Sequence, residues 1–160
     1  SNRLRAAYHG SDGRGLGRIL EPSAGLGRIY TAVRAVHRAA PVVLVDVSPE
    51  CAGELYRATE GDGAAELVVA DFLTIGTDRL GRFDTVVMNP PFRMGTDIKH
   101  IRRAAGLLRL GGRLVSLCAA GPKQRRAFDG AAGVRWIDLP AGTFKSEGTG
   151  VESAIVVIDS

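Results

Sequence analysis

The segment Arg18-Ile19-Leu20-Glu21-Pro22-Ser23-Ala24-Gly25-Leu26-Gly27 joins a short apolar run to a glycine-rich turn. Glycine at such a turn lets the backbone approach a ligand closely, and the helix that follows offers free N–H groups and a positive dipole end. A dinucleotide-binding turn requires a third glycine at the position where this chain has Tyr30. The segment therefore predicts a strand, a ligand-binding turn and a helix, and it argues against an NAD site.

Five more apolar runs follow along the chain, and segments with helical patterns lie between most of them. The runs cover residues 42–46, 67–71, 85–89, 114–118 and 154–158. β-Branched residues dominate these runs without alternation of polar and apolar positions, which is typical of strands buried on both faces. The pattern predicts an α/β domain with a doubly wound, mostly parallel sheet and right-handed crossovers. The length of 160 residues suits one such domain.

Two of the intervening helices have recognisable ends. Ser48 and Pro49 predict the N-cap and first turn of one helix, and Gly61 predicts its end. Thr96 or Asp97 is expected to cap a second helix. The apolar stripe of this second helix is expected to contain Ile98, Ile101, Ala105 and Leu108, with the glycines at 111 and 112 ending it.

Polar residues stand at or beside the ends of four of the first five apolar runs, at Glu21, Asp46, Asp71 and Asn89. The carboxyl ends of parallel strands face the ligand crevice, so we expect these side chains along one rim of the sheet. Asp46 is expected to accept hydrogen bonds from the two hydroxyls of a ribose. Asp71 is expected beside an adenine amino group, with Phe72 next to the ring.

The tetrapeptide Asn89-Pro90-Pro91-Phe92 follows the fourth apolar run directly. Two prolines cannot extend a central strand, so they predict a rigid turn at the same rim. The side-chain oxygen of Asn89 and the carbonyl of Pro90 can both accept hydrogen bonds from one amino group. Phe92 offers a flat face to a planar partner.

The chain carries 21 basic and 17 acidic residues, a balance that permits a polyanionic partner without requiring one. Residues 98–128 contain eight bases and no acid, whereas residues 46–84 contain nine acids and three bases. The basic stretch is either a phosphate-facing edge or a set of charges that solvates outer helix faces. The candidate nucleic-acid contacts are Lys99, Arg103, Lys123, Arg125, Arg126 and Lys145.

Several other kinds of site are not expected. Cys51 and Cys118 are far apart and neither belongs to a C-x-x-C pair, so we expect neither a disulfide nor a metal site. His9, His37 and His100 are scattered, and we expect none of them to bind metal or transfer protons. No apolar run approaches the roughly 18 residues of a membrane span, so we expect a cytoplasmic protein without membrane contact.

The order of these motifs resembles the class I S-adenosylmethionine-dependent methyltransferases. Specifically, E-P-x-x-G-x-G, a strand-end Asp, Asp-Phe and then N-P-P-F is similar to the N6-adenine and N4-cytosine DNA amino-methyltransferases, and to glutamine amide methyltransferases. The resemblance covers residues 19–158. Residues 139–151 are also similar to a loop of phage-type and bacterial adenine methylases, which adds weight to a DNA substrate.

The resemblance implies a seven-stranded Rossmann-like methyltransferase sheet and S-adenosyl-L-methionine as cofactor. The cofactor-binding residues that it implies are Glu21, Ser23, Ala24, Gly25, Gly27, Asp46, Val47, Asp71 and Phe72. The catalytic residues that it implies are Asn89, Pro90, Pro91 and Phe92, which would hold the target amine and stack on the base. No strong base is then required, because positioning supplies most of the rate.

The function expected from this resemblance is methyl transfer to an exocyclic amino group of a nucleic-acid base, foremost adenine N6 in DNA. Cytosine N4 is included as a sub-case. The alternatives are an RNA-base methyltransferase, a glutamine N5 protein methyltransferase and a catalytically silent cofactor-binding interaction subunit. We expect residues 1–160 to form a single methyltransferase domain without a separate target-recognition domain. Besides nucleic acid, the candidate partners are a recognition subunit or a second copy of the chain in a homodimer.

Overall fold

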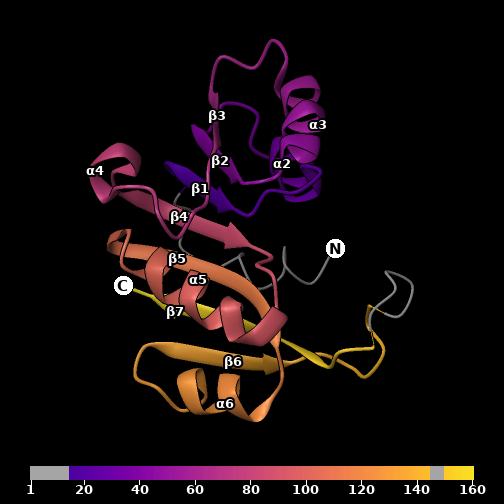
Figure 1. The fold of residues 1–160 in the computed structure, drawn as a ribbon. Helices are drawn as coiled ribbons and strands as arrows, with labels where there is room; N and C mark the ends of the chain where they lie inside the picture. The colour runs from indigo at the N-terminus through magenta and orange to yellow at the C-terminus, as the bar shows by residue number, and fades with distance from the viewer. Residues whose placement is uncertain (1–14, 145–149) are drawn as a thin grey trace.

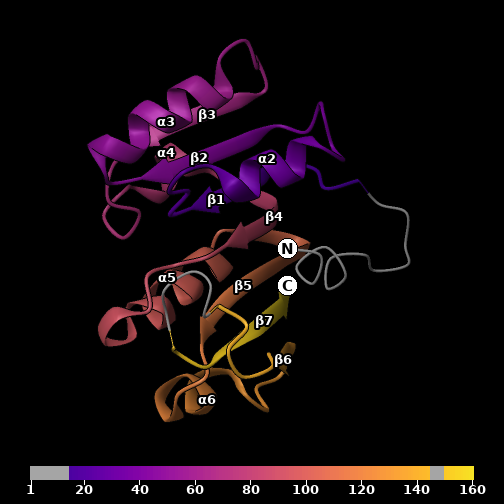
Figure 2. The ribbon, with the colours of Figure 1, turned by 90° about the vertical axis from the view of Figure 1, so that its right-hand side faces the viewer.

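The apolar runs of the sequence form strands of one twisted sheet, and helices cover both of its faces (Figure 1, Figure 2). The computed structural model describes residues 15–144 and 150–160. The strands are β1 (Ile19–Pro22), β2 (Val42–Asp46), β3 (Ala65–Val69), β4 (Phe83–Met88), β5 (Leu108–Ala119), β6 (Val134–Asp138) and β7 (Ser153–Asp159). The α-helices are α2 (Arg28–Arg34), α3 (Pro49–Thr59), α4 (Thr77–Leu80), α5 (Thr96–Ala105) and α6 (Pro122–Phe128), and a 3₁₀ turn, η1 (Arg93–Gly95), precedes α5.

The strand order across the sheet is β3-β2-β1-β4-β5-β7-β6. The pairs from β3 to β5 are parallel, and β7 runs antiparallel to both of its neighbours. The seven-stranded, mostly parallel, doubly wound sheet expected from the sequence is thus confirmed. The chain winds outward through β1, β2 and β3 in one direction and through β4 and β5 in the other. The switch between β1 and β4 is where open α/β sheets bind ligands.

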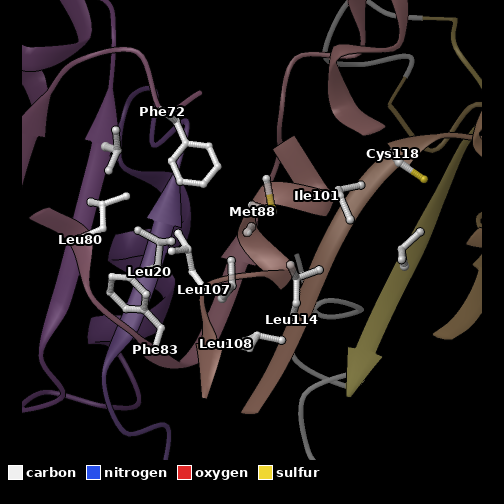
Figure 3. Close-up of a cluster of buried hydrophobic side chains, with 14 of the residues drawn as sticks. Leu20, Phe72, Leu80, Phe83, Met88, Ile101, Leu107, Leu108, Leu114 and Cys118 are labelled. Carbon is white, nitrogen blue, oxygen red and sulfur yellow. The ribbon is translucent and has the colours of Figure 1, made fainter. Parts of the chain in front are cut away.

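Alternation along each strand divides the core between the two faces of the sheet. Leu20 and Val43 belong to the cluster covered by α4, α5 and α6. Their neighbours Ile19 and Val42 belong to the cluster on the opposite face, covered by α2 and α3. Figure 3 shows the first cluster, with Phe72 at its edge. Both faces of the central strands are therefore apolar, which explains why their sequences show no alternation.

The second helix predicted from the sequence is shorter than expected. Helix α5 ends at Ala105, and Leu108 lies in β5, where it pairs with Phe83. A Cβ atom on Gly112 would lie 3.0 Å from the carbonyl oxygen of Asp84. The glycine is needed for this close approach of two strands at a register shift, so the glycine pair does not mark the end of a helix.

The predicted cap of α3 is confirmed, because Ser48 Oγ accepts a backbone hydrogen bond of 3.3 Å from the first turn. The predicted cap of α5 is wrong, because the N-cap residue is Gly95. The Asp97 side chain instead turns inward, where it is fully buried. Its carboxylate accepts hydrogen bonds from Ala119 N at 3.0 Å and from Gln124 Nε2 at 3.1 Å. These donors satisfy a buried charge and tie α5 to β5 and α6.

The two edge strands depart most from the sequence-based expectation. β3 is half exposed rather than buried, because it has a neighbour on only one side. It ends at Val69, so Asp71 lies two residues beyond the strand. No apolar run marks β6 at the other edge, although its half-buried Trp136 packs against the core.

Candidate functional site

The carboxyl ends of β1, β2, β3 and β4 border a groove of about 710 Å³ at the topological switch point. Nine of the thirteen residues predicted to bind cofactor or to act in catalysis line this groove: Ser23, Asp46, Val47, Asp71, Phe72, Asn89, Pro90, Pro91 and Phe92. The other four belong to β1 or to the turn after it: Glu21, Ala24, Gly25 and Gly27. The fold thus gathers residues that are up to 71 positions apart in the chain.

The turn after β1 has a left-handed backbone at Ser23 (φ 63°), Gly25 (φ 55°) and Gly27 (φ 75°). Glycine adopts this conformation without steric cost, whereas a serine there is strained by roughly 1–2 kcal/mol. Backbone strain in a folded protein clusters at ligand-binding sites. A hydrogen bond of 2.9 Å from Ala24 N to Val45 O anchors the turn to β2.

The Asp46 carboxylate joins the turn after β1 to the start of α3. Its Oδ2 accepts a hydrogen bond of 2.7 Å from Gly25 N, and its Oδ1 accepts one of 2.8 Å from Ser48 N. A carboxylate has about four lone-pair positions, so each oxygen can accept another donor from a ligand. The side chain is buried apart from the edge that lines the groove.

Glu21 is the one buried carboxylate beside the groove with an unpartnered oxygen in the described ranges 15–144 and 150–160. The side chain is 2% exposed, and its Oε2 atom has no hydrogen-bond partner there. Burial raises the Glu21 pKa well above its usual 4.5; a backbone hydrogen bond from Tyr30 opposes this shift, and the nearby Asp46 charge adds to it. A buried acceptor without a donor is costly, and this oxygen is also sealed from solvent in the structure.

The loop after β3 supplies a carboxylate and an aromatic ring to the groove. Asp71 is exposed, and its Oδ1 accepts a hydrogen bond of 2.9 Å from Leu73 N. Phe72 is 3% exposed and belongs to the main core cluster. The polar group therefore stays accessible at the groove while the ring forms part of its apolar wall.

The N-P-P-F turn begins directly after the last residue of β4 and lines the groove over its whole length. Asn89 is exposed, whereas Pro90 is buried. Phe92 is half-buried and packs against the cluster that β5 and β7 form on the other face of the sheet, together with Leu139 and Phe144. The turn is therefore held at both ends by the core.

Two polar residues at the start of α5 line the groove but were not predicted to do so, Thr96 and His100. His100 is 6% exposed. The two residues are four positions apart on a helix that starts at the carboxyl edge of the sheet, which places both on one side of the helix. That spacing was the signal available in the sequence. The remaining groove residues without a prediction are Val45, Ala70, Leu73 and Val151.

Three of the candidate nucleic-acid contacts, Lys99, Lys123 and Arg126, are exposed. None of the three has an ion-pair partner within residues 15–144 and 150–160. Lys99 and Lys123 lie in the first turns of α5 and α6, and these helices cover the same face of the sheet (Figure 1). Lys145 lies outside the described residues.

The other two candidates, Arg103 and Arg125, are occupied by contacts within the protein. Arg103 donates a hydrogen bond to the carbonyl oxygen of Ile75 and lies 5.4 Å over the Phe72 ring. Arg125 pairs with Asp138 at 2.6 Å. Two guanidinium nitrogens of Arg125 thus face Asp138, and Arg103 is half-buried against Phe72, so these two bases are less accessible to phosphate than the three exposed ones.

Within the described ranges, no three His, Cys, Asp or Glu side chains are grouped as metal ligands. The helices of those ranges are also too short or too polar to cross a bilayer.

A family model for the methyltransferase small domain matches residues 12–130. The chain belongs to this family. Comparison with curated protein sequences found no match.

Three solved structures illustrate how widely this methyltransferase fold is shared. TrmN from Thermus thermophilus superposes with a TM-score of 0.73 at 22% identity, over 99% of this chain and 47% of TrmN. A predicted O-methyltransferase from Agrobacterium tumefaciens, Atu636, gives 0.68 at 24%, over 93% and 76% of the two chains. A putative RNA methyltransferase from Pyrococcus horikoshii, PH1948, gives 0.63 at 22%, over 99% and 78%. The methyltransferase small domain described here spans about half the length of TrmN.

The family and its fold also identify the methyl donor. Methyltransferases of this type use S-adenosyl-L-methionine, which is therefore the cofactor of this chain. The acceptor is a separate question, because a predicted O-methyltransferase and a putative RNA methyltransferase have the same fold.

Proposed function

We propose that this chain transfers a methyl group to the exocyclic amino group of a nucleic-acid base, with adenine N6 in DNA as the first candidate acceptor. The observation that carries the proposal is that the N-P-P-F turn borders the same groove as Ser23, Asp46 and Asp71. In the sheet, β4 lies beside β1. The acids proposed to bind the cofactor nucleoside, Asp46 and Asp71, lie on the β2–β3 side of β1. The Asn89 and Pro90 acceptors follow β4, on the other side of β1. This arrangement suits transfer from a bound nucleoside to an amine.

The residues around the turn after β1 fit the parts of S-adenosyl-L-methionine. Glu21, near the end of β1, is assigned to the ammonium group, although its unpartnered Oε2 is sealed from solvent in this structure. The paired oxygens of Asp46 suit the ribose hydroxyls. Val47 and Phe72 offer apolar surface to the adenine ring, with Asp71 near its amino group. The turn residues assigned to the methionine part are Ser23, Ala24, Gly25 and Gly27, whose backbone can approach closely.

The proposed chemistry needs orientation more than acid or base strength. When bound, S-adenosyl-L-methionine supplies an electrophilic methyl group on a sulfonium centre. The Asn89 side-chain oxygen and the Pro90 carbonyl oxygen each accept a hydrogen bond from one N–H of the target amine. These two bonds orient the nitrogen lone pair toward the bound methyl donor. The two prolines keep these acceptors in place before the amine arrives, so little conformational entropy is lost on binding. The proton leaves after transfer, when the nitrogen has become acidic.

Phe92 is proposed to stack on the target base. Its contacts with the β5–β7 cluster fix the ring, and the part that lines the groove remains available. A base in a duplex must first leave the helix, at a cost of a few kcal/mol. Stacking of the base on an aromatic ring offsets roughly 1–3 kcal/mol of that cost.

RNA is the second candidate substrate, favoured by the similarity of the fold to the putative RNA methyltransferase PH1948. The similarity of residues 139–151 to a loop of adenine methylases favours DNA, and residues 145–149 of that segment lie outside the described residues. The N-P-P-F turn serves an adenine amine in either nucleic acid.

Methyl transfer from tritiated S-adenosyl-L-methionine tests the proposal. Unmethylated duplex DNA, RNA and a bacterial protein extract are incubated in parallel, and the labelled fraction is digested to identify the modified unit. We expect N6-methyladenine in DNA. Label in an RNA base would select the second candidate. Label in methylglutamine, or no transfer to any substrate although the cofactor binds in calorimetry, would overturn the proposal.

Asp46→Asn is expected to weaken binding of S-adenosyl-L-homocysteine by about 1–3 kcal/mol, which is roughly 5- to 150-fold. The amide nitrogen would face a backbone N–H at either Gly25 or Ser48 and would also lose a ribose acceptor. Isothermal titration calorimetry measures the effect. Asp129→Asn, at an exposed carboxylate on another part of the chain, is the matched control and should bind as the wild type does. Unchanged affinity in Asp46→Asn would mean that the ribose site is misplaced.

Reversing the charges of the two exposed lysines in the first turns of α5 and α6, by combining Lys99→Glu with Lys123→Glu, is expected to weaken nucleic-acid binding. Each phosphate contact contributes a slope of about −0.9 to the dependence of log affinity on log salt for duplex DNA, so the slope should fall by about 2. Fluorescence anisotropy at several salt concentrations measures it. The single variants Lys99→Glu and Lys123→Glu are measured as well. Arg38→Glu, at an exposed base after α2 on the other face of the sheet, makes the same change in charge as either single variant and is their control. An equal loss in the control would indicate an unspecific charge effect.

A further inference from the structure

The loop after β3 is held by two side chains of α5. The Phe72 and His100 rings stack with centroids 5.7 Å apart and planes 30° apart. On the same side of α5, Arg103 donates to the carbonyl oxygen of Ile75 and covers the Phe72 ring. Helix α5 therefore joins the N-P-P-F turn, which precedes it, to the loop that the proposed function assigns to the cofactor adenine.

The hydrogen bond of His100 defines which ring nitrogen carries the proton. Its Nδ1 lies 3.0 Å from the carbonyl oxygen of Thr96. A carbonyl oxygen can only accept, so Nδ1 is the donor. In an imidazole that carries its one proton on Nδ1, the lone pair is on Nε2. Nε2 is therefore the ring nitrogen that can accept a hydrogen bond from a partner outside the helix.

The Nε2 atom of His100 has no protein donor in the described part of the chain, and it is not among the buried polar atoms that are sealed from solvent. His100 is nonetheless only 6% exposed, and it is one of the residues that line the groove. A largely buried acceptor without a protein donor, on a residue that lines the groove, favours a ligand that brings an N–H donor.

We propose that His100 Nε2 accepts a hydrogen bond from the exocyclic amino group of the cofactor adenine and makes the site selective for adenine over hypoxanthine. An amino group has two hydrogens, so Asp71 and His100 can each accept one. Hypoxanthine carries a carbonyl oxygen at that position, which would oppose the lone pair of Nε2. The inference rests on the proposed placement of the cofactor and is independent of the acceptor substrate.

Calorimetry with two ligands that differ only at this position tests the inference. S-Adenosyl-L-homocysteine has the amino group, and S-inosyl-L-homocysteine has the carbonyl oxygen. The wild type should prefer the adenosyl ligand. His100→Phe keeps a ring that can stack on Phe72 but removes Nε2, and it should bind the adenosyl ligand about 10-fold more weakly without a matching loss for the inosyl ligand. His100→Gln, which offers an amide oxygen, should restore part of the preference.

The ratio of the two affinities separates recognition from structure. An equal loss for both ligands in His100→Phe would mean that the histidine only supports the Phe72 loop, and an unchanged ratio would overturn the inference. Thermal unfolding of each variant shows whether it is folded. Asp46→Asn provides the second arm: if it loses affinity while the His100 variants keep the wild-type ratio, only the role of His100 is wrong. If Asp46→Asn binds as the wild type does, the proposed cofactor site itself fails.

Discussion

Asn89→Ala is expected to reduce methyl transfer by about 100- to 1,000-fold while affinity for S-adenosyl-L-homocysteine stays within about 2-fold of the wild type. Asn89 is exposed at the end of β4, and its side chain makes no hydrogen bond to another residue within 15–144 and 150–160. Its removal therefore leaves the turn intact, since the buried Pro90 and the packed Phe92 hold that segment. The loss falls on the orientation of the amine alone.

Single-turnover transfer and calorimetry, measured on the same preparation, separate these two effects. Asn89→Asp retains oxygen acceptors at the same position and should keep more activity than Asn89→Ala. Transfer near the wild-type rate in Asn89→Ala would contradict the role assigned to the N-P-P-F turn. A parallel loss of cofactor affinity would instead mean that Asn89 belongs to the cofactor site.

Glu21→Gln is expected to raise the free energy of unfolding of the ligand-free protein at neutral pH and to weaken cofactor binding. The folded state raises the Glu21 pKa above its usual 4.5, chiefly through burial, so the folded protein holds this proton more tightly than the unfolded chain. Stability contributed by the protonated group is complete below about 4.5 and is lost as the pH rises through the raised folded value. An uncharged amide does not undergo this loss.

The same variant removes the carboxylate proposed to hold the ammonium group, a charged hydrogen bond worth about 1.5–3 kcal/mol, or roughly 10- to 150-fold in affinity. Denaturant unfolding at about pH 5 and about pH 8 measures the first effect, and calorimetry with S-adenosyl-L-homocysteine measures the second. Glu54→Gln, at an exposed carboxylate of α3, is the control and should change neither quantity appreciably. If Glu21→Gln is more stable than the wild type but binds S-adenosyl-L-homocysteine equally well, Glu21 does not bind the ammonium group.

The parts of the fold that could be predicted are those that local chemistry decides. The β-branched runs at 42–46 and 154–158 lie within β2 and β7, and Ser48 and Gly61 bound α3 as expected. The start of β5 could not be predicted, because Leu108 continues the apolar spacing of α5 and only its pairing with Phe83 draws it into the sheet. β6 is short and half exposed, so no continuous apolar run marks it.

Local sequence indicated which chemical groups stand at the ends of the central strands: the turn after β1, Asp46 as the last residue of β2, and the N-P-P-F turn after β4. It could do so because parallel strands present their carboxyl ends at one edge, so order along the chain translates into position on the rim. The partners of the side chains on α5 depend instead on tertiary packing. Asp97 was predicted as a helix cap but is a buried residue that accepts a hydrogen bond from the backbone of β5. Arg103 was predicted as a surface base but packs over the Phe72 ring. His100 lines the groove, which was not predicted from the sequence. Those outcomes depend on which loops and helices pack against α5, and packing between distant segments is not encoded in local spacing.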